Sequence, residues 1–195
     1  MLRDLIISKV RIKILQTFLY QPQELFYVRQ LVRATGEEIN AVRRELLRME
    51  KAGMVQKETR GNRLYYWFNQ NHPLFGDLLS LINKTIGLGK AIIENKTKIG
   101  KIKFAVLSGR FARRLPTREG GVDLLMVGEV NMPKLVEIVK IEEEKQEREI
   151  NYSVMSKQEF EFRKKRRDPF LLGILTSSRL MLIGDEEELA SRTDV

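Results

Sequence analysis

Ala105-Val-Leu-Ser-Gly-Arg-Phe-Ala-Arg-Arg114 and, soon afterwards, Gly120-Gly-Val-Asp-Leu-Leu-Met-Val-Gly128 are the stretches that decide the fold of the second half of this chain. Apolar runs in and around them predict two short β-strands, over 101–107 and 122–127. A glycine follows the first strand directly, and one carboxylate lies within the second. Strands this apolar must be covered by other elements, so the segments around them determine the fold class.

The residues after these strands alternate between helical and extended patterns. Asn131 and Pro133 are favoured at the start of a helix, and Ser156-Lys-Gln-Glu159 is a capping box. Mixed strands and helices predict a compact α+β domain over residues 100–195. The expected elements are a helix over 131–148, a strand over 149–155, helices from 156 and over 170–175, and a strand over 180–183.

The first third of the chain has the periodicity of three helices followed by a hairpin. Apolar residues recur at helical spacing over 8–20, 27–36 and 37–51, and a glycine supplies the turn between the second and third helices. Two β-rich segments, 54–59 and 64–68, flank a Gly-Asn turn, which is typical of a β-hairpin. Two helices joined by a tight turn form a helix-turn-helix.

Positive charge is concentrated in the same region. The chain has a net charge of +9, and the first 70 residues, with 13 basic and 7 acidic residues, account for +6. With Val42, Leu46 and Met49 turned toward a core, the third helix leaves a polar face that can bond base edges. Arginines at the hairpin turn and on the second helix suit phosphate contacts. The candidate DNA-binding residues are Arg29, Arg33, Asn40, Ala41, Arg43, Arg44, Arg48, Arg60, Asn62 and Arg63.

This ordered set of helices and hairpin resembles the winged-helix transcription regulators of the arsenical-resistance-repressor type, over roughly residues 8–69. The resemblance implies a winged-helix domain over residues 1–70 that binds double-stranded DNA. It also implies a homodimer, because such regulators commonly dimerise through helices that flank the DNA-binding unit. Winged helices also serve as protein-interaction modules, and exposed arginines often only face solvent, so these alternatives stay open at this point.

A helical connector is expected over residues 71–99. Leu74, Leu78, Leu81 and Ile82 recur at helical spacing and form an apolar face. This face could pack between two domains or pair with its own copy in a dimer, and the sequence favours neither.

Two motifs in the second half resemble the active site of minimal nucleotidyltransferases of the DNA-polymerase-β superfamily. One is Ser108-Gly-Arg-Phe-Ala-Arg113, and the other is Gly121-Val-Asp123. In that family a Gly-Ser pair cradles the nucleotide phosphates, and an Asp-x-Asp pair on the next strand holds magnesium for phosphoryl transfer. The resemblance implies a nucleotidyltransferase-like mixed sheet with helices over residues 100–195.

The match departs from the family at the residues that carry the chemistry. Arg110 replaces the serine, and Gly121 stands where the first acid belongs. Glu149 or Asn151 falls near the family's third acid. One remaining acid of the pair is a poor site for two-metal catalysis, so we expect no catalytic residue, no metal site and no cofactor. A nucleotide could still bind through Gly109, Arg110 and Asp123.

The amino-acid composition limits the cellular compartment that the chain fits and the kinds of metal site that it can form. The chain has no cysteine and a single histidine, which excludes disulfides and thiolate metal sites and argues against a histidine metal site. No apolar run approaches the roughly 20 residues that span a bilayer, so no membrane partner is expected. A cysteine-free chain fits the cytoplasm.

The sequence therefore predicts a cytoplasmic, DNA-binding transcriptional regulator whose second domain serves as a scaffold, sensor or partner surface. Two alternatives remain. One is an active nucleotidyltransferase that its winged helix targets, and the other is an antitoxin-like protein that pairs with a second protein. Gly121 bears on the first alternative, because metal-dependent transfer needs the acid that this position lacks.

Overall fold

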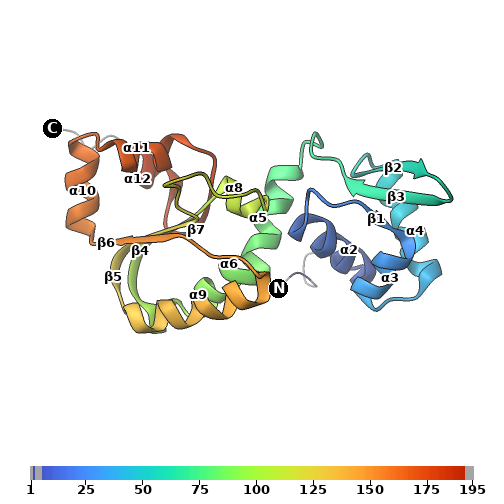
Figure 1. Ribbon diagram of the computed structural model, residues 1–195, viewed down its shortest axis with the longest axis horizontal. Coiled ribbons are helices and arrows are strands. Elements are labelled where there is room, and N and C mark those ends of the chain that lie inside the picture. Colours follow the sequence, from blue (N-terminus) through green and yellow to red (C-terminus); the bar gives the residue numbers. More distant parts are fainter. Residues whose placement is uncertain (1, 3–5, 192–195) are drawn as a thin grey trace. The chain divides into compact units, whose positions relative to one another are not determined.

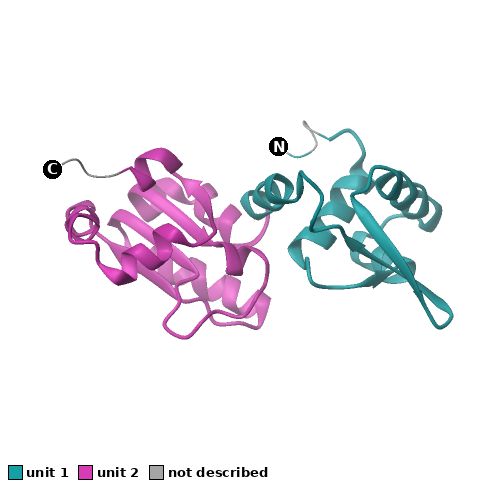
Figure 2. Cartoon of the chain, turned by 90° about the horizontal axis from the view of Figure 1, so that it is seen from above, with its two compact units in different colours: residues 1–85 teal, residues 86–195 magenta. Residues whose placement is uncertain are grey.

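The computed structural model describes residue 2 and residues 6–191, and it has an α+β fold. Residues Met1–Thr85 and Ile86–Val195 form two compact units, which Figure 2 draws in separate colours. The boundary lies inside the segment 71–99 that was expected to be one connector, so the helices of that segment belong to different units. No helix of the described residues is long and apolar enough to cross a membrane.

Local sequence signals explain where the helices of the first unit begin and end. Ser8 accepts a hydrogen bond from the backbone N–H of Arg11, and Glu38 accepts one from that of Ala41, so each side chain caps a helix. Gly36 ends one helix at φ 63°, in the left-handed region that favours glycine. The helices, labelled in Figure 1, are α2 (Lys9–Tyr20), α3 (Val28–Thr35), α4 (Ile39–Lys51) and α5 (Phe75–Thr85).

The core of the first unit lies where α4 packs against α2 and α3. Val42, Leu46 and Met49 of α4 are buried, as the periodicity predicted. The helix α5 packs against α2, and its buried residues include Ile82 of the expected face but otherwise differ from it. Phe75, Leu79 and Ile82 are buried, whereas Leu74 is 47% exposed because it precedes the first turn of the helix.

A small antiparallel sheet completes the first unit. Its strands β1 (Phe26–Tyr27), β2 (Val55–Arg60) and β3 (Arg63–Phe68) lie in the order β1-β3-β2. The strands β2 and β3 form the expected hairpin, and Gly61 takes φ 57° at its turn. The strand β1 was not predicted, because two residues are too few for an alternating pattern to be recognised.

The second unit is built on a four-stranded mixed sheet. Its strands are β4 (Gly100–Ser108), β5 (Leu124–Val130), β6 (Tyr152–Met155) and β7 (Arg179–Ile183), in the order β6-β5-β4-β7. The pair β5–β6 is parallel, and β4 runs antiparallel to both of its neighbours. The strand β5 begins at Leu124 and not at 122 as expected, so Gly121 and Asp123 both precede it.

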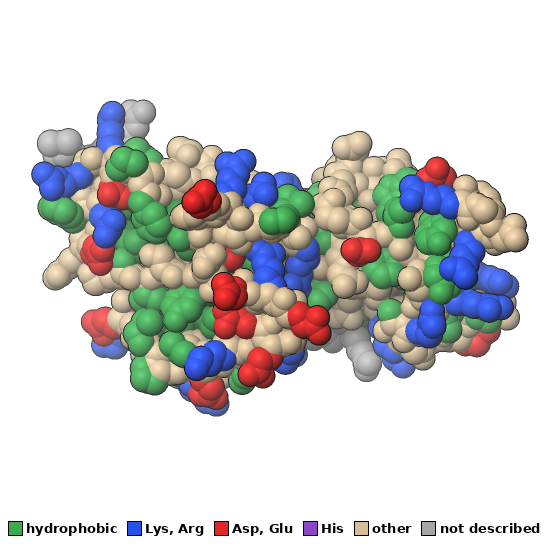
Figure 3. Space-filling view, viewed as in Figure 1, with side chains coloured by type: hydrophobic (Ala, Val, Ile, Leu, Met, Phe, Trp, Pro, Cys, Tyr) green, Lys and Arg blue, Asp and Glu red, His purple; other side chains and the backbone are tan. Residues whose placement is uncertain are grey.

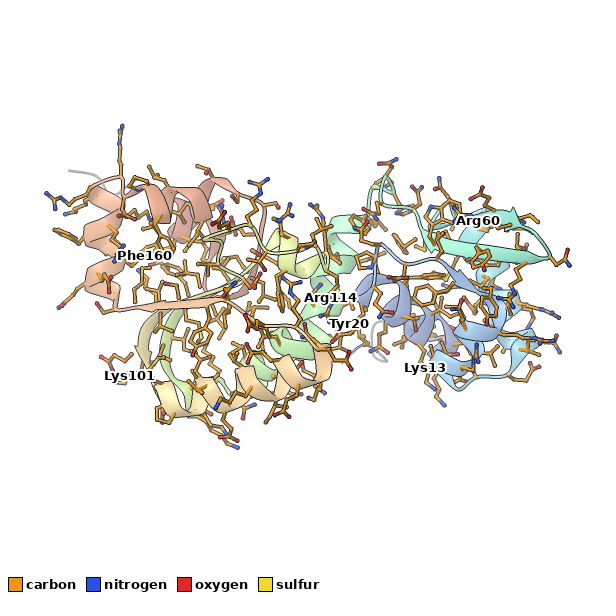
Figure 4. The ribbon with its side chains drawn as sticks, viewed as in Figure 1. Lys13, Tyr20, Arg60, Lys101, Arg114 and Phe160 are labelled. Atoms are coloured by element: carbon orange, nitrogen blue, oxygen red, sulfur yellow. The ribbon has the colours of Figure 1, made fainter. Side chains whose placement is uncertain are left out.

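Helices cover both faces of this sheet. One face carries a cluster in which Phe104, Val106 and Leu125 of the strands are buried with Phe160 and Leu171 of the covering helices. Figure 4 shows Phe160 pointing from its helix toward the sheet, and Figure 1 shows α6 and α9 on the other side. The helices are α6 (Gly87–Glu94), α7 (Lys96–Ile99), α8 (Gly109–Ala112), α9 (Met132–Gln146), α10 (Lys157–Lys165), α11 (Pro169–Thr176) and α12 (Glu186–Ala190).

Candidate functional sites

The helix α4 presents a basic face away from the core of the first unit. Asn40, Arg43, Arg44 and Arg48 are exposed on this face, and Ala41 is half-buried. Figure 3 shows Lys and Arg side chains gathered over the edge of the first unit where α4 and the β2–β3 hairpin lie. Leu47 also lies on this face and is 52% exposed. Leu47 was not among the predicted DNA-binding residues, although it lies off the buried stripe of α4 and between arginines.

The candidate arginines differ in whether an acid already neutralises them. Within the described part of the chain, no acidic side chain forms an ion pair with Arg29, Arg43 or Arg44. By contrast, Arg48 lies 3.0 Å from Glu45, and Arg60 lies 3.0 Å from Glu58. These three arginines can therefore meet a polyanion without first breaking an ion pair.

Tyr27 of β1 holds two further candidate arginines that lie far apart in the sequence. Arg33 of α3 donates to the Tyr27 hydroxyl at 2.9 Å, and the Arg63 guanidinium lies 4.9 Å from the centre of the same ring. The ring also meets Tyr65 edge to face, with 5.9 Å between the ring centroids. Asn62 is exposed at the hairpin turn. Sequence reasoning missed Tyr27, because its role depends on the unrecognised strand β1.

A buried carboxylate ties α4 to α2. Glu45 is only 5% exposed, and it accepts hydrogen bonds from Arg11 at 2.9 Å and from Arg48 at 3.0 Å. Burial alone would raise the pKa of Glu45, but hydrogen bonds from Arg11, Ser8 and Arg48 and the Arg11 charge outweigh it, so the pKa is lowered. Glu45 is therefore part of the framework that supports α4.

In the second unit, Asp123 is fully buried and its two oxygens are occupied. Thr117 donates its hydroxyl to the carboxylate, at 2.8 and 2.9 Å from the two oxygens. Arg148 lies 3.2 Å from Oδ1, and the backbone N–H of Asn151 donates to Oδ2 at 3.1 Å. Arg148 also donates to Thr117 at 2.7 Å and stacks over Phe111, 5.1 Å from the ring centre. This network anchors the loop before β5 to the segment before β6.

Gly109 is needed for close packing, and its N–H group is already used. The N–H donates to the carbonyl of Ser178 at 2.7 Å, just before β7. A Cβ atom at this position would lie 2.2 Å from the Ser178 hydroxyl and 2.8 Å from its carbonyl oxygen. The glycine therefore lets α8 approach the segment before β7, and its own N–H does not point to a free phosphate position.

The acidic residues of the second unit do not assemble into a metal site. Gly121 lies against the loop, where a Cβ atom would be 2.8 Å from the carbonyl oxygen of Arg118. Glu149 and Asn151 are exposed, and both precede β6. Among residue 2 and residues 6–191, no group of three or more His, Cys, Asp or Glu residues could hold a metal ion. The residues present therefore do not fit the two-metal chemistry of the resembled family.

A cavity of about 530 Å³ lies close to this network in the second unit. Its lining includes Arg110, Thr117 and Gly121, but Asp123 is not part of it. Of the three residues predicted to bind a nucleotide, only Arg110 thus lines the cavity. Asp123 lies behind the Thr117 hydroxyl, and Gly109 packs against Ser178. Comparisons of the chain with protein-family models, with curated proteins and with solved structures found no match.

Proposed function

We propose that the chain is a DNA-binding transcriptional regulator. Its first unit would act as a winged helix that places α4 in the major groove, with the β2–β3 hairpin as the wing. The observation that carries this proposal is the outward face of α4, where Arg43 and Arg44 are exposed and have no ion pair among the described residues. The concentration of positive charge in the first 70 residues supports the same partner.

Each exposed side chain of α4 suits a different feature of a base pair. Asn40 can bond adenine, and Arg43 and Arg44 can bond guanine, each through two hydrogen bonds. Leu47, which is 52% exposed among cations, suits contact with the methyl group of thymine. Ala41 is half-buried and can make only a small apolar contact.

The remaining candidates would hold the DNA backbone and set the register. Arginines on α3, at the end of α4 and at the hairpin turn can neutralise phosphates, which adds affinity without reading sequence. These arginines are Arg29, Arg33, Arg48, Arg60 and Arg63, and Asn62 at the hairpin turn can add an uncharged hydrogen bond to a phosphate. As a cytoplasmic homodimer, the protein would read two half-sites about 34 Å apart, which is one turn of DNA.

The second unit would serve this regulator as a nucleotidyltransferase-like domain without catalysis. The burial of Asp123 and its hydrogen bonds to Thr117, Arg148 and Asn151 support this role. A carboxylate whose oxygens are occupied by donors within the protein is poorly placed to bridge two metal ions.

A selection from random double-stranded DNA tests the proposal directly. The full chain is expected to enrich a defined sequence, and Arg43→Ala/Arg44→Ala should weaken binding to it by at least about tenfold, since one bidentate base contact carries about 1–3 kcal/mol. The matched control is Lys140→Ala/Lys157→Ala, which removes the same charge from exposed positions on α9 and α10. This control should keep the sequence preference.

The outcomes separate specific binding from general attraction to a polyanion. An equal loss of affinity in both variants would indicate charge alone and would count against a reading role for α4. Failure of the wild-type chain to enrich any sequence would remove the proposal. If the Arg43→Ala/Arg44→Ala variant still binds DNA with the same sequence preference, the residues that contact the bases lie elsewhere in the chain.

A further inference from the structure

The cavity of the second unit has the size of a small-molecule site. Its volume of about 530 Å³ lies within the roughly 300 to 1,000 Å³ typical of such sites. Val106 and Leu125 of the sheet and Phe170 and Ile174 of α11 are apolar residues that line it. Nothing in the proposed reading of DNA by α4 uses this cavity.

The lining of the cavity also contains basic residues. Arg110 and Arg118 are among them, and neither forms an ion pair with an acidic side chain in the described part of the chain. Arg110 is oriented by a hydrogen bond from Nε to the Pro116 carbonyl at 3.0 Å, which leaves its two terminal nitrogens for another acceptor. Glu119, the acidic lining residue, is exposed.

Arg179 adds a third guanidinium group to the residues that line the cavity. Its terminal nitrogens contact Glu186 and the Leu175 carbonyl. Its Nε atom is buried and has no hydrogen-bond partner among the described residues. A buried N–H without an acceptor is unfavourable, so a ligand oxygen that reached it would remove that cost. The serines Ser177 and Ser178 are also lining residues.

These features together assign a ligand chemistry: the structure points to a small phosphate monoester with a flat apolar group, bound without a metal ion. The two arginines without ion pairs match a phosphate monoester, whose charge is close to −2 at neutral pH. The apolar lining residues match the organic group. Among the residues that the structure describes, no cluster of acidic side chains could hold a metal ion, so the guanidinium groups supply the positive charge of the site. The inference concerns the second unit alone and does not depend on DNA binding.

The fluorescent compound 1-naphthyl phosphate is a suitable probe, because its binding to the full chain can be followed by fluorescence anisotropy. We expect saturable binding with a Kd below about 1 mM, which corresponds to about −4 kcal/mol. Inorganic phosphate and 1-naphthol, which each lack one half of the ligand, should bind at least about tenfold more weakly. Chelation of divalent metals with EDTA should leave the affinity unchanged.

Two variants and a control test the location of the site. Arg110→Gln/Arg118→Gln should weaken binding at least about tenfold, because hydrogen bonds to charged groups carry about 1.5–3 kcal/mol. Gly173→Leu should block the cavity and keep the fold, because Gly173 lines it on α11 and a Cβ atom there meets no atom within 4 Å. Lys140→Gln/Lys157→Gln makes the same change of charge at exposed positions outside the lining and should bind like the wild type.

The result that supports the inference is metal-independent binding that both cavity variants lose and the control keeps. Absence of saturable binding, binding that requires magnesium, or binding that Gly173→Leu leaves intact would overturn it. None of these outcomes affects DNA binding by the first unit, so the inference and the proposed function fail separately.

Discussion

Replacement of Asp123 by alanine is expected to destabilise the second unit, and the size of the effect follows from its contacts. The carboxylate is fully buried, and it accepts hydrogen bonds from Thr117, Arg148 and the Asn151 backbone. Removing one partner of a buried ion pair costs about 3–5 kcal/mol. Arg148 is 22% exposed and can recover some hydration, so we expect the lower end, about 3 kcal/mol.

The assay is urea unfolding of the full chain, followed by two probes. Trp67 is the single tryptophan and lies on β3, so its fluorescence reports the first unit. Far-UV circular dichroism reports both units. We expect Asp123→Ala to move the transition that dichroism detects for the second unit to lower urea. Asp123→Asn retains the shape of the side chain and should cost less.

Glu149→Ala is the matched control, because it removes an exposed acid close to β6. Surface changes of this kind usually alter stability by less than about 0.5 kcal/mol. If Asp123→Ala were as stable as the wild type, or more stable, the hydrogen-bond network would not hold the loop. The carboxylate would then be kept for a ligand, and the case against catalysis would lose its main support.

Three further perturbations follow from the same contacts. Glu45→Gln should lower the stability of the first unit at pH 7. Because the folded-state pKa of Glu45 is lowered from its ordinary 4.5, the wild type should also lose more stability than the variant as the pH falls below 4.5. Acid titration of the Trp67 signal checks this difference. Gly121→Asp restores the acid pair in the sequence, but its Cβ atom would lie 2.8 Å from the Arg118 carbonyl oxygen. Incubation of this variant with labelled ATP and magnesium should therefore show no label transfer. Label transfer that a further Asp123→Ala change abolishes would contradict this expectation. Gly109→Ala should cost about 1–3 kcal/mol of unfolding free energy by crowding Ser178, and an unchanged urea midpoint would show that α8 can move away.

The spacing of apolar residues predicted most helices and strands, because each of these elements buries one face. The residues of that face lie close together in the sequence, so their spacing can be recognised within the segment itself. The buried stripe of α4 at Val42, Leu46 and Met49 is an example. Boundaries were less predictable. The strand β5 begins at Leu124, because the residues before it are engaged by a loop contact that no local pattern encodes. The short helix α12 was also missed.

The side chains of the candidate sites were partly predictable, for a related reason. Exposure of Arg43 and Arg44 follows from their offset to the buried stripe of the same helix. The environment of Asp123 depends on Thr117 and Arg148, and Arg148 is 25 positions away in the chain. A motif shows which residue is present, but only the fold shows which donors reach it.

The contacts of Tyr27 affect how much side-chain entropy the arginines around it would lose when they bind DNA. Tyr27 holds the side chains of Arg33 and Arg63 before any partner arrives, whereas Arg43 and Arg44 have no such support among the described contacts. A free arginine side chain carries about 2 kcal/mol of rotamer entropy, and much of it is lost when the side chain is immobilised. The arginines around Tyr27 would therefore meet the DNA backbone at little entropic cost, while those on α4 would become ordered only against a sequence that offers them partners.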